Sequence, residues 1–103
     1  MDINYSIGTY YTEATDMHRF IATENGEQIG GLWIDLDRTI IMNIEVIKSR
    51  RGEGIATALY NEAVKTLPAV LHAPEAARTF EGNRFAEAVG GETAEHMDEL
   101  EAA

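Results

Sequence analysis

Along the first half of the chain, apolar residues alternate with polar ones in the way that is typical of β-strands. Between the second and third of these stretches lies Asn25-Gly26, which favours a tight hairpin turn because both residues tolerate a positive φ angle. Gly30-Gly31 predicts a bulge or a close approach of another group. We therefore predict an antiparallel meander of three or four strands, drawn from residues 3–11, 18–23, 28–36 and 39–47.

From Gly54 to Leu67 the apolar residues recur at the spacing of a helix, and Pro68 stops that helix. Residues 69–72 form a short apolar run that predicts one more strand. Residues 75–89 have a helical composition, and two glycines close the segment. This order indicates an α+β (mixed α/β) fold, in which an antiparallel meander is followed by a helix, a strand and a second helix.

Length and composition favour a small cytoplasmic protein. The chain has 103 residues, 45% of them hydrophobic, which predicts a single domain over residues 1–103. Residues 92–103 are expected to be an acidic tail, either frayed or a short helix. There is no cysteine, and therefore no disulfide framework or cysteine nucleophile. We see no secretion signal and no apolar stretch of the roughly 18–20 residues that span a bilayer.

The formal net charge of −10 disfavours binding to nucleic acid or to an anionic membrane, because like charges repel. It fits a basic partner, or a need for solubility. Against this background Lys48, Arg50 and Arg51 form a local positive cluster, which predicts either an anion site or surface charges that balance nearby carboxylates.

The segment from Arg50 to Ala56 joins the last strand of the meander to the first helix, and its composition predicts a phosphate site. A helix N-terminus leaves about four backbone N–H groups unpaired and carries a partial positive charge. Glycines at 52 and 54 allow close approach of an anion, for which pyrophosphate is the natural guest. The segment fails the P-loop pattern, because Ile55 follows Gly54, and the dinucleotide pattern, because Thr57 replaces the third small residue.

Ile44-Glu45-Val46 on the last strand, followed by Arg51, Gly54 and Ile55-Ala56 in register, resembles the signature of the GNAT N-acetyltransferase superfamily. The resemblance covers residues 18–91 and implies an acyl-CoA N-acyltransferase-like fold. It also implies acetyl-CoA as co-substrate, with no metal. In that family the backbone at Glu45 and Val46 would pair with the pantetheine arm, while the amides of the loop would hold the pyrophosphate. The implied cofactor-binding residues are Val46, Arg51, Gly52, Glu53, Gly54, Ile55 and Ala56.

The catalytic part of the pattern is met less fully. Glu45 is the only acid on its strand and is the candidate general base, with an exposed or salt-bridged strand acid as the alternative. The position of a frequent family tyrosine, the general acid toward the CoA thiolate, holds Ala86. We expect His72, beside Pro74, to be a surface loop residue, with a base or an acceptor contact as the alternative. The chain also resembles small, truncated members of the family, because only about residues 12–17 replace the usual N-terminal helix pair.

Our leading hypothesis is transfer of an acetyl group from acetyl-CoA to a cationic amine acceptor, such as a Lys side chain, an N-terminus or a polyamine. One alternative is a catalytically inactive module that binds CoA or another protein. Another is an acidic decoy that binds a basic protein. Small size and an open strand edge also fit a homodimer.

Overall fold

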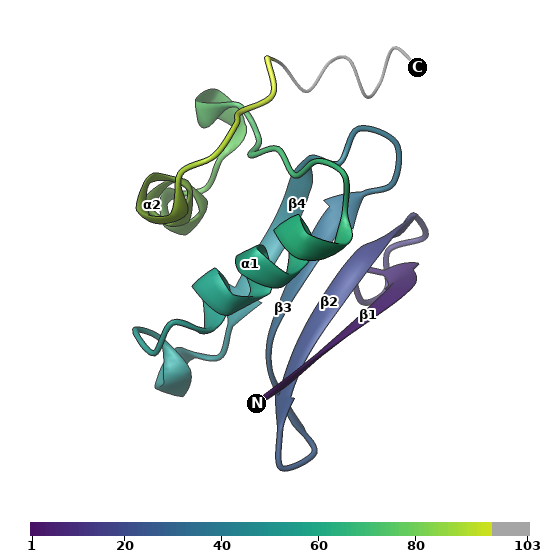
Figure 1. The fold of residues 1–103 in the computed structure, drawn as a ribbon, viewed down its shortest axis with the longest axis vertical. Helices are drawn as coiled ribbons and strands as arrows, with labels where there is room; N and C mark the ends of the chain where they lie inside the picture. The colour runs from purple at the N-terminus through teal and green to yellow at the C-terminus, as the bar shows by residue number, and fades with distance from the viewer. Residues whose placement is uncertain (96–103) are drawn as a thin grey trace.

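The computed structural model describes residues 1–95, and its first half is one antiparallel sheet (Figure 1). The strands follow one another in space as they do in the chain, in the order β1-β2-β3-β4. The predicted meander is confirmed. Its strands are β1 (Asp2–Thr9), β2 (Asp16–Glu24), β3 (Glu27–Asp35) and β4 (Ile41–Val46).

The turn between β2 and β3 has the conformation that its sequence predicts. Asn25 and Gly26 have φ angles of 52° and 79°, as a two-residue hairpin of this type requires. A bulge follows in β3, because Ala22 pairs with Gly30 while Thr23 pairs with Gln28. Next to it, a Cβ added to Gly31 would collide with the indole ring of Trp33. Gly30 therefore lies next to a bulge, and Gly31 leaves room for the close approach of the Trp33 ring.

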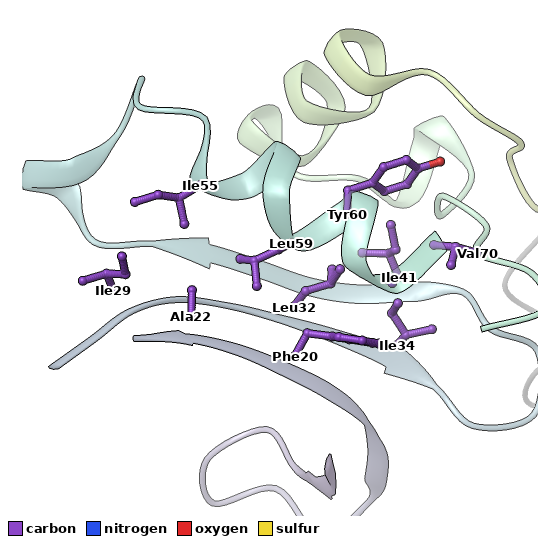
Figure 2. Close-up of a cluster of buried hydrophobic side chains, with 11 residues drawn as sticks. Phe20, Ala22, Ile29, Leu32, Ile34, Ile41, Ile55, Leu59, Tyr60 and Val70 are labelled. Atoms are coloured by element: carbon purple, nitrogen blue, oxygen red, sulfur yellow. The ribbon is translucent and has the colours of Figure 1, made fainter. Parts of the chain in front are cut away.

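Helix α1 (Ile55–Thr66) lies across one face of the sheet, over β2, β3 and β4 (Figure 1). Its apolar side meets the inward-facing residues of these strands, and burial of this apolar surface is the main force that holds the two layers together (Figure 2). Val64, which belongs to the apolar residues of the predicted stripe, is instead 51% exposed. The helix ends where Leu67 turns extended before Pro68. The fully buried side chains of the core include Phe20, Ile29, Leu32, Ile34 and Leu59.

After α1 the chain returns to the sheet beside the start of β4. The predicted strand at residues 69–72 forms only isolated parallel bridges. Leu71 exchanges backbone hydrogen bonds of 2.8 Å with Thr39 and Ile41, and His72 bridges Thr93. The predicted helix at 75–89 is two helices: a short 3₁₀ turn, Glu75–Ala77, and α2 (Phe80–Val89). Thr79 separates them, since its extended backbone and its side chain cap α2. The helix expected in the acidic tail lies mostly outside the described residues.

Between β1 and β2 only residues 10–15 intervene, and they contain no helix. The expected absence of an N-terminal helix pair is therefore confirmed. Among residues 1–95, no helix is long and apolar enough to cross a membrane.

Candidate functional site

A groove of about 1110 Å³ runs along the open edge of β4 toward the N-terminus of α1. It lies between β4, the loop that follows it and α2. All the cofactor-binding residues predicted from the sequence except Glu53 line this groove. Its walls include Ile44, Glu45, Val46, Arg51, Gly52, Gly54, Ile55, Ala56, Thr79, Arg84 and Phe85.

The backbone pairing of β4 changes at Met42. Before it, Ile41 donates to Leu71 across the parallel bridge. At Met42 the pairing with β3 slips by one residue, because Trp33 pairs with Asn43 and Ile34 with Ile41. This bulge was not predicted, since nothing in a run of Ile and Met residues marks it.

Beyond the bulge, the backbone of β4 faces the groove at alternate residues. The N–H of Ile47 donates to Ile29 of β3 at 3.0 Å. By alternation, the polar backbone groups of Ile44 and Val46 point away from β3. The carbonyl of Val46 accepts a hydrogen bond from Nε of Arg51 at 3.3 Å. This edge thus presents hydrogen-bonding groups to any extended chain that enters the groove.

The loop that closes this end of the groove depends on two glycines in the left-handed region. Gly52 has a φ angle of 83° and Gly54 one of 86°. A Cβ added at either position would meet no atom within 4 Å, so backbone conformation alone, not space, explains the choice of glycine. The open space above both residues leaves their backbone accessible to a ligand.

The first turn of α1 has no side-chain cap. Its backbone hydrogen bonds begin with Ala58, which donates to Gly54 at 3.0 Å. The N–H groups of Ile55, Ala56 and Thr57 precede this first bond and lie at the groove, where the helix dipole favours an anion. α2 differs, because Thr79 Oγ1 accepts from the N–H of Gly82 at 3.0 Å.

The basic cluster divides into two parts. Arg50 forms ion pairs with Glu24 at 3.0 Å and Glu53 at 2.9 Å, which tie the loop to the β2–β3 hairpin. These contacts raise the pKa of Arg50, with the hydrogen bond to Glu24 contributing most, and they lower the pKa of Glu24. Arg50 lines the groove together with Lys48 and Arg51. The side chain of Glu53 therefore serves the loop's own structure.

Glu45 lies beside the groove and is held by two tyrosines. The hydroxyl of Tyr10 donates to Oε1, and that of Tyr11 donates to Oε2 at 2.8 Å. The hydrogen bond to Glu45 is the main reason that the pKa of Tyr10 rises to about 12, and burial adds to it. Tyr11 is raised in pKa for the same reasons. Neither tyrosine was predicted to contact Glu45, because no local signal connects residues 34 or 35 positions apart in the chain.

Around these tyrosines an aromatic cluster covers the sheet face opposite α1. The rings of Tyr10 and Tyr11 lie 4.8 and 5.7 Å from that of Trp33. Tyr11 has a φ angle of 50°, an uncommon value for a bulky residue. This turn brings two consecutive side chains to the same carboxylate.

His72 is 3% exposed, so the expectation of a surface loop residue was wrong. Its backbone bridges Thr93, and its ring stacks on Tyr60 and lines a second, smaller cavity. Burial lowers the pKa of His72, and the charge of Arg78 adds to this, against the opposing hydrogen bond with Gly90. The sequence did not show that residues after α2 return to cover this side chain.

Ala86, at the position of the frequent family tyrosine, is buried and offers no side-chain proton. Tyr60 and Trp33 are core residues. Within the part of the chain that the structure describes, no group of three or more His, Cys, Asp or Glu residues is arranged to hold a metal ion.

Comparison with protein-family models gives one match, described as the acetyltransferase (GNAT) family, over residues 3–89. Searches of curated proteins and of solved structures found no match. The matched region contains all four strands, both α-helices and the whole loop between β4 and α1. The chain therefore belongs to the acetyltransferase (GNAT) family.

Proposed function

We propose that this protein binds acetyl-CoA in the groove along β4 and transfers its acetyl group to an amine. The observation that carries the proposal is the uncapped first turn of α1, which follows two left-handed glycines and opens into that groove. Backbone N–H groups arranged in this way bind phosphate without any side chain. Membership of the acetyltransferase (GNAT) family supports the choice of acyl-CoA as the phosphate-bearing ligand.

Residues of the loop and strand divide the binding of acetyl-CoA between them. The amides from Gly52 to Ala56 would hold the pyrophosphate, and Arg51, which lines the groove, would add a charge-assisted contact. The outward-facing groups of Ile44 and Val46 would pair with the amides of the pantetheine arm as an added strand does. Arg51 would have to release the carbonyl of Val46 when this happens, because the carbonyl is its present partner.

The amine would approach the thioester carbonyl from the side of Glu45. The carboxylate stands at the wall of the groove with both oxygens fixed by tyrosines, which suits it to orient a cationic acceptor. Its role as general base remains the prediction that we drew from the sequence. The net charge of −10 supports a Lys side chain, an N-terminus or a polyamine as acceptor.

Calorimetry with acetyl-CoA tests the binding step. Ala56→Glu places a carboxylate in the first turn of α1, where it interacts favourably with the helix dipole but repels phosphate. Asn61→Glu is the matched control, because Asn61 is exposed on the same helix and lies outside the groove. We expect the first variant to weaken binding at least about 10-fold and the second to leave it unchanged. A folded wild-type protein that binds no acetyl-CoA would refute the proposal.

A second candidate is a module that binds CoA without catalysis. Ala86 favours it, because the alanine cannot supply the proton that the family's frequent tyrosine gives to the leaving thiolate. Acetylation assays with amines of the three classes named above separate the two. Binding without turnover on any of them would support the inactive module.

The remaining partners are part of the same proposal. The acidic charge supports the exclusion of nucleic acid and of anionic membranes, and composition supports a cytoplasmic location.

β1 pairs with β2 on one side only, which leaves a strand edge where a second copy of the chain could pair. A homodimer stays a prediction, tested by light scattering.

A further inference from the structure

A buried histidine, His72, lines a smaller cavity that is bounded by the bulge of β4 and by α2. This cavity and the groove share four wall residues, so they adjoin, and the two together are called the channel below. These shared residues are Ile44, Glu45, Thr79 and Phe85.

The ring of His72 is fixed on three sides. Its Nε2 lies 2.6 Å from the carbonyl oxygen of Gly90. Its plane stacks on Tyr60, with centroids 5.4 Å apart and planes 6° apart, while Phe85 meets its edge at 5.8 Å. Three independent contacts on a side chain that is 3% exposed leave it a single orientation.

These contacts also determine the tautomer. A carbonyl oxygen only accepts hydrogen bonds, so the Nε2 atom that contacts Gly90 must carry the hydrogen. In a neutral imidazole the other nitrogen, Nδ1, then holds a free lone pair. Burial, which lowers the pKa of His72, keeps the ring in this neutral form.

Nδ1 of His72 is not sealed in the core. The ring's hydrogen bond within residues 1–95 is made through Nε2, to Gly90. In the same part of the chain, no fully buried side-chain nitrogen or oxygen lacks a partner. Nδ1 therefore keeps some accessible surface, and His72 is among the residues that line the cavity of about 160 Å³.

We propose that Nδ1 of His72 is the proton acceptor for the attacking amine at the acyl end of the channel. This inference rests on the proposed function, which puts phosphates at the α1 end and so directs the acyl group toward the cavity. Met42, Asn43 and Glu45 of β4 also line that cavity.

The acceptor reacts as the neutral amine, so an ammonium group first releases one proton to solvent. The amine nitrogen then forms a bond to the thioester carbon, and the carbonyl π electrons move to oxygen. The amine proton passes to Nδ1. When the carbonyl re-forms, the carbon–sulfur bond breaks, and the imidazolium gives the same proton to the CoA thiolate. The products are the amide and CoA thiol, and no tyrosine at position 86 is needed.

Other charged and titratable groups surround the ring. Arg78 disfavours its protonation from the segment before α2, and Tyr60 Oη from α1 shares the carbonyl of Gly90 at 3.5 Å. From β4, Glu45 lines the same cavity. The pH profile of the wild type must therefore be compared with variants at both His72 and Glu45.

His72→Gln is the informative variant, because a glutamine amide nitrogen can still donate to Gly90 but cannot take up the proton. With acetyl-CoA and an amine accepted by the wild type, we expect kcat to fall about 100-fold or more, the usual contribution of a general base. The acid limb of the kcat/KM profile should disappear with it. His18→Gln, on β2 and bonded to Tyr5, is the matched control and should keep the wild-type rate.

Acetyl-CoA calorimetry and thermal unfolding show whether His72→Gln still folds and binds. Ring nitrogen chemical shifts in the NMR spectrum of the wild type give a second readout, with Nδ1 bare and Nε2 protonated. The opposite tautomer would overturn the inference, as would a His72→Gln variant with the wild-type rate and pH profile. If the acid limb of the kcat/KM profile disappeared only in Glu45→Gln, the proton acceptor would be Glu45 and not His72. A wild type that binds acetyl-CoA but acetylates no amine refutes catalysis itself.

Discussion

Single residues in the channel owe their chemistry to partners that are distant in the chain. Glu45 meets Tyr10 and Tyr11 across the sheet, and His72 meets the carbonyl of Gly90 beyond α2. Each contact fixes one titratable side chain in one orientation. In the reaction proposed above, both side chains would therefore be oriented before substrate arrives.

The link between Glu45 and Tyr10 predicts a specific titration. The pKa of Tyr10 is about 12, whereas that of an unfolded tyrosine is about 10. The folded protein holds this proton more tightly, so its contribution to folding stability is lost as pH rises from about 10 to about 12. Glu45→Gln should move the pKa of Tyr10 back toward 10.

Absorbance of tyrosinate during an alkaline titration measures this, with Tyr10→Phe used to identify the late-titrating group. Tyr5→Phe is the control, because Tyr5 bonds His18 and has no contact with Glu45. An unchanged late titration in Glu45→Gln would contradict the role we give to the carboxylate.

At the level of elements, the two α-helices begin in contrasting ways. α2 is capped by Thr79, whereas α1 starts at Gly54 with a left-handed backbone and no capping side chain. A cap usually stabilises a helix by about 1 kcal/mol. Leaving it out at α1 keeps the first-turn amides accessible, which is what a phosphate site requires.

Thr79→Ala removes the cap of α2. Because the N–H of Gly82 loses its partner, we expect the free energy of unfolding to fall by about 1 kcal/mol. Urea unfolding followed by circular dichroism measures it. Thr79→Ser keeps the accepting oxygen and should unfold like the wild type, so an equal loss in both variants would contradict the capping role.

Elements with local signals were predictable from the sequence. Asn25-Gly26 marks its turn, Pro68 ends α1, and the glycine loop marks the start of that helix. The break at Thr79 was missed, because a capping threonine inside a helical composition has no strong signal. The burial of His72 and the tyrosines around Glu45 were missed for another reason: they depend on how the elements pack in three dimensions, which periodicity does not report.

On the scale of the whole molecule, acidic residues outnumber basic ones, and the basic ones are unevenly distributed. The chain has 18 acidic and 8 basic residues, and the groove gathers Lys48 and Arg51 beside the helix N-terminus. An anionic ligand is thus drawn to one region of a protein that repels it elsewhere. Under the proposed function, the acidic remainder would favour a cationic acceptor.

Self-repulsion of this net charge predicts that salt stabilises the fold. The Debye length falls from about 30 Å at 0.01 M salt to about 8 Å at 0.15 M. We expect Tm to rise over this range, since the exposed ion pairs that salt weakens contribute little. Thermal unfolding in sodium chloride measures this, with an uncharged cosolute as control. A fall in Tm would show that ion pairs outweigh the net repulsion.

The succession of strands in chain order has a consequence for the kinetics of folding. Each strand pairs with the strand that precedes it in the chain, so the sheet forms by closing short loops, which has a small entropic cost. The bridges Ile40–Leu71 and His72–Thr93 join more distant residues. The histidine end of the channel is therefore expected to assemble last, after the sheet and α1 have formed a stable nucleus.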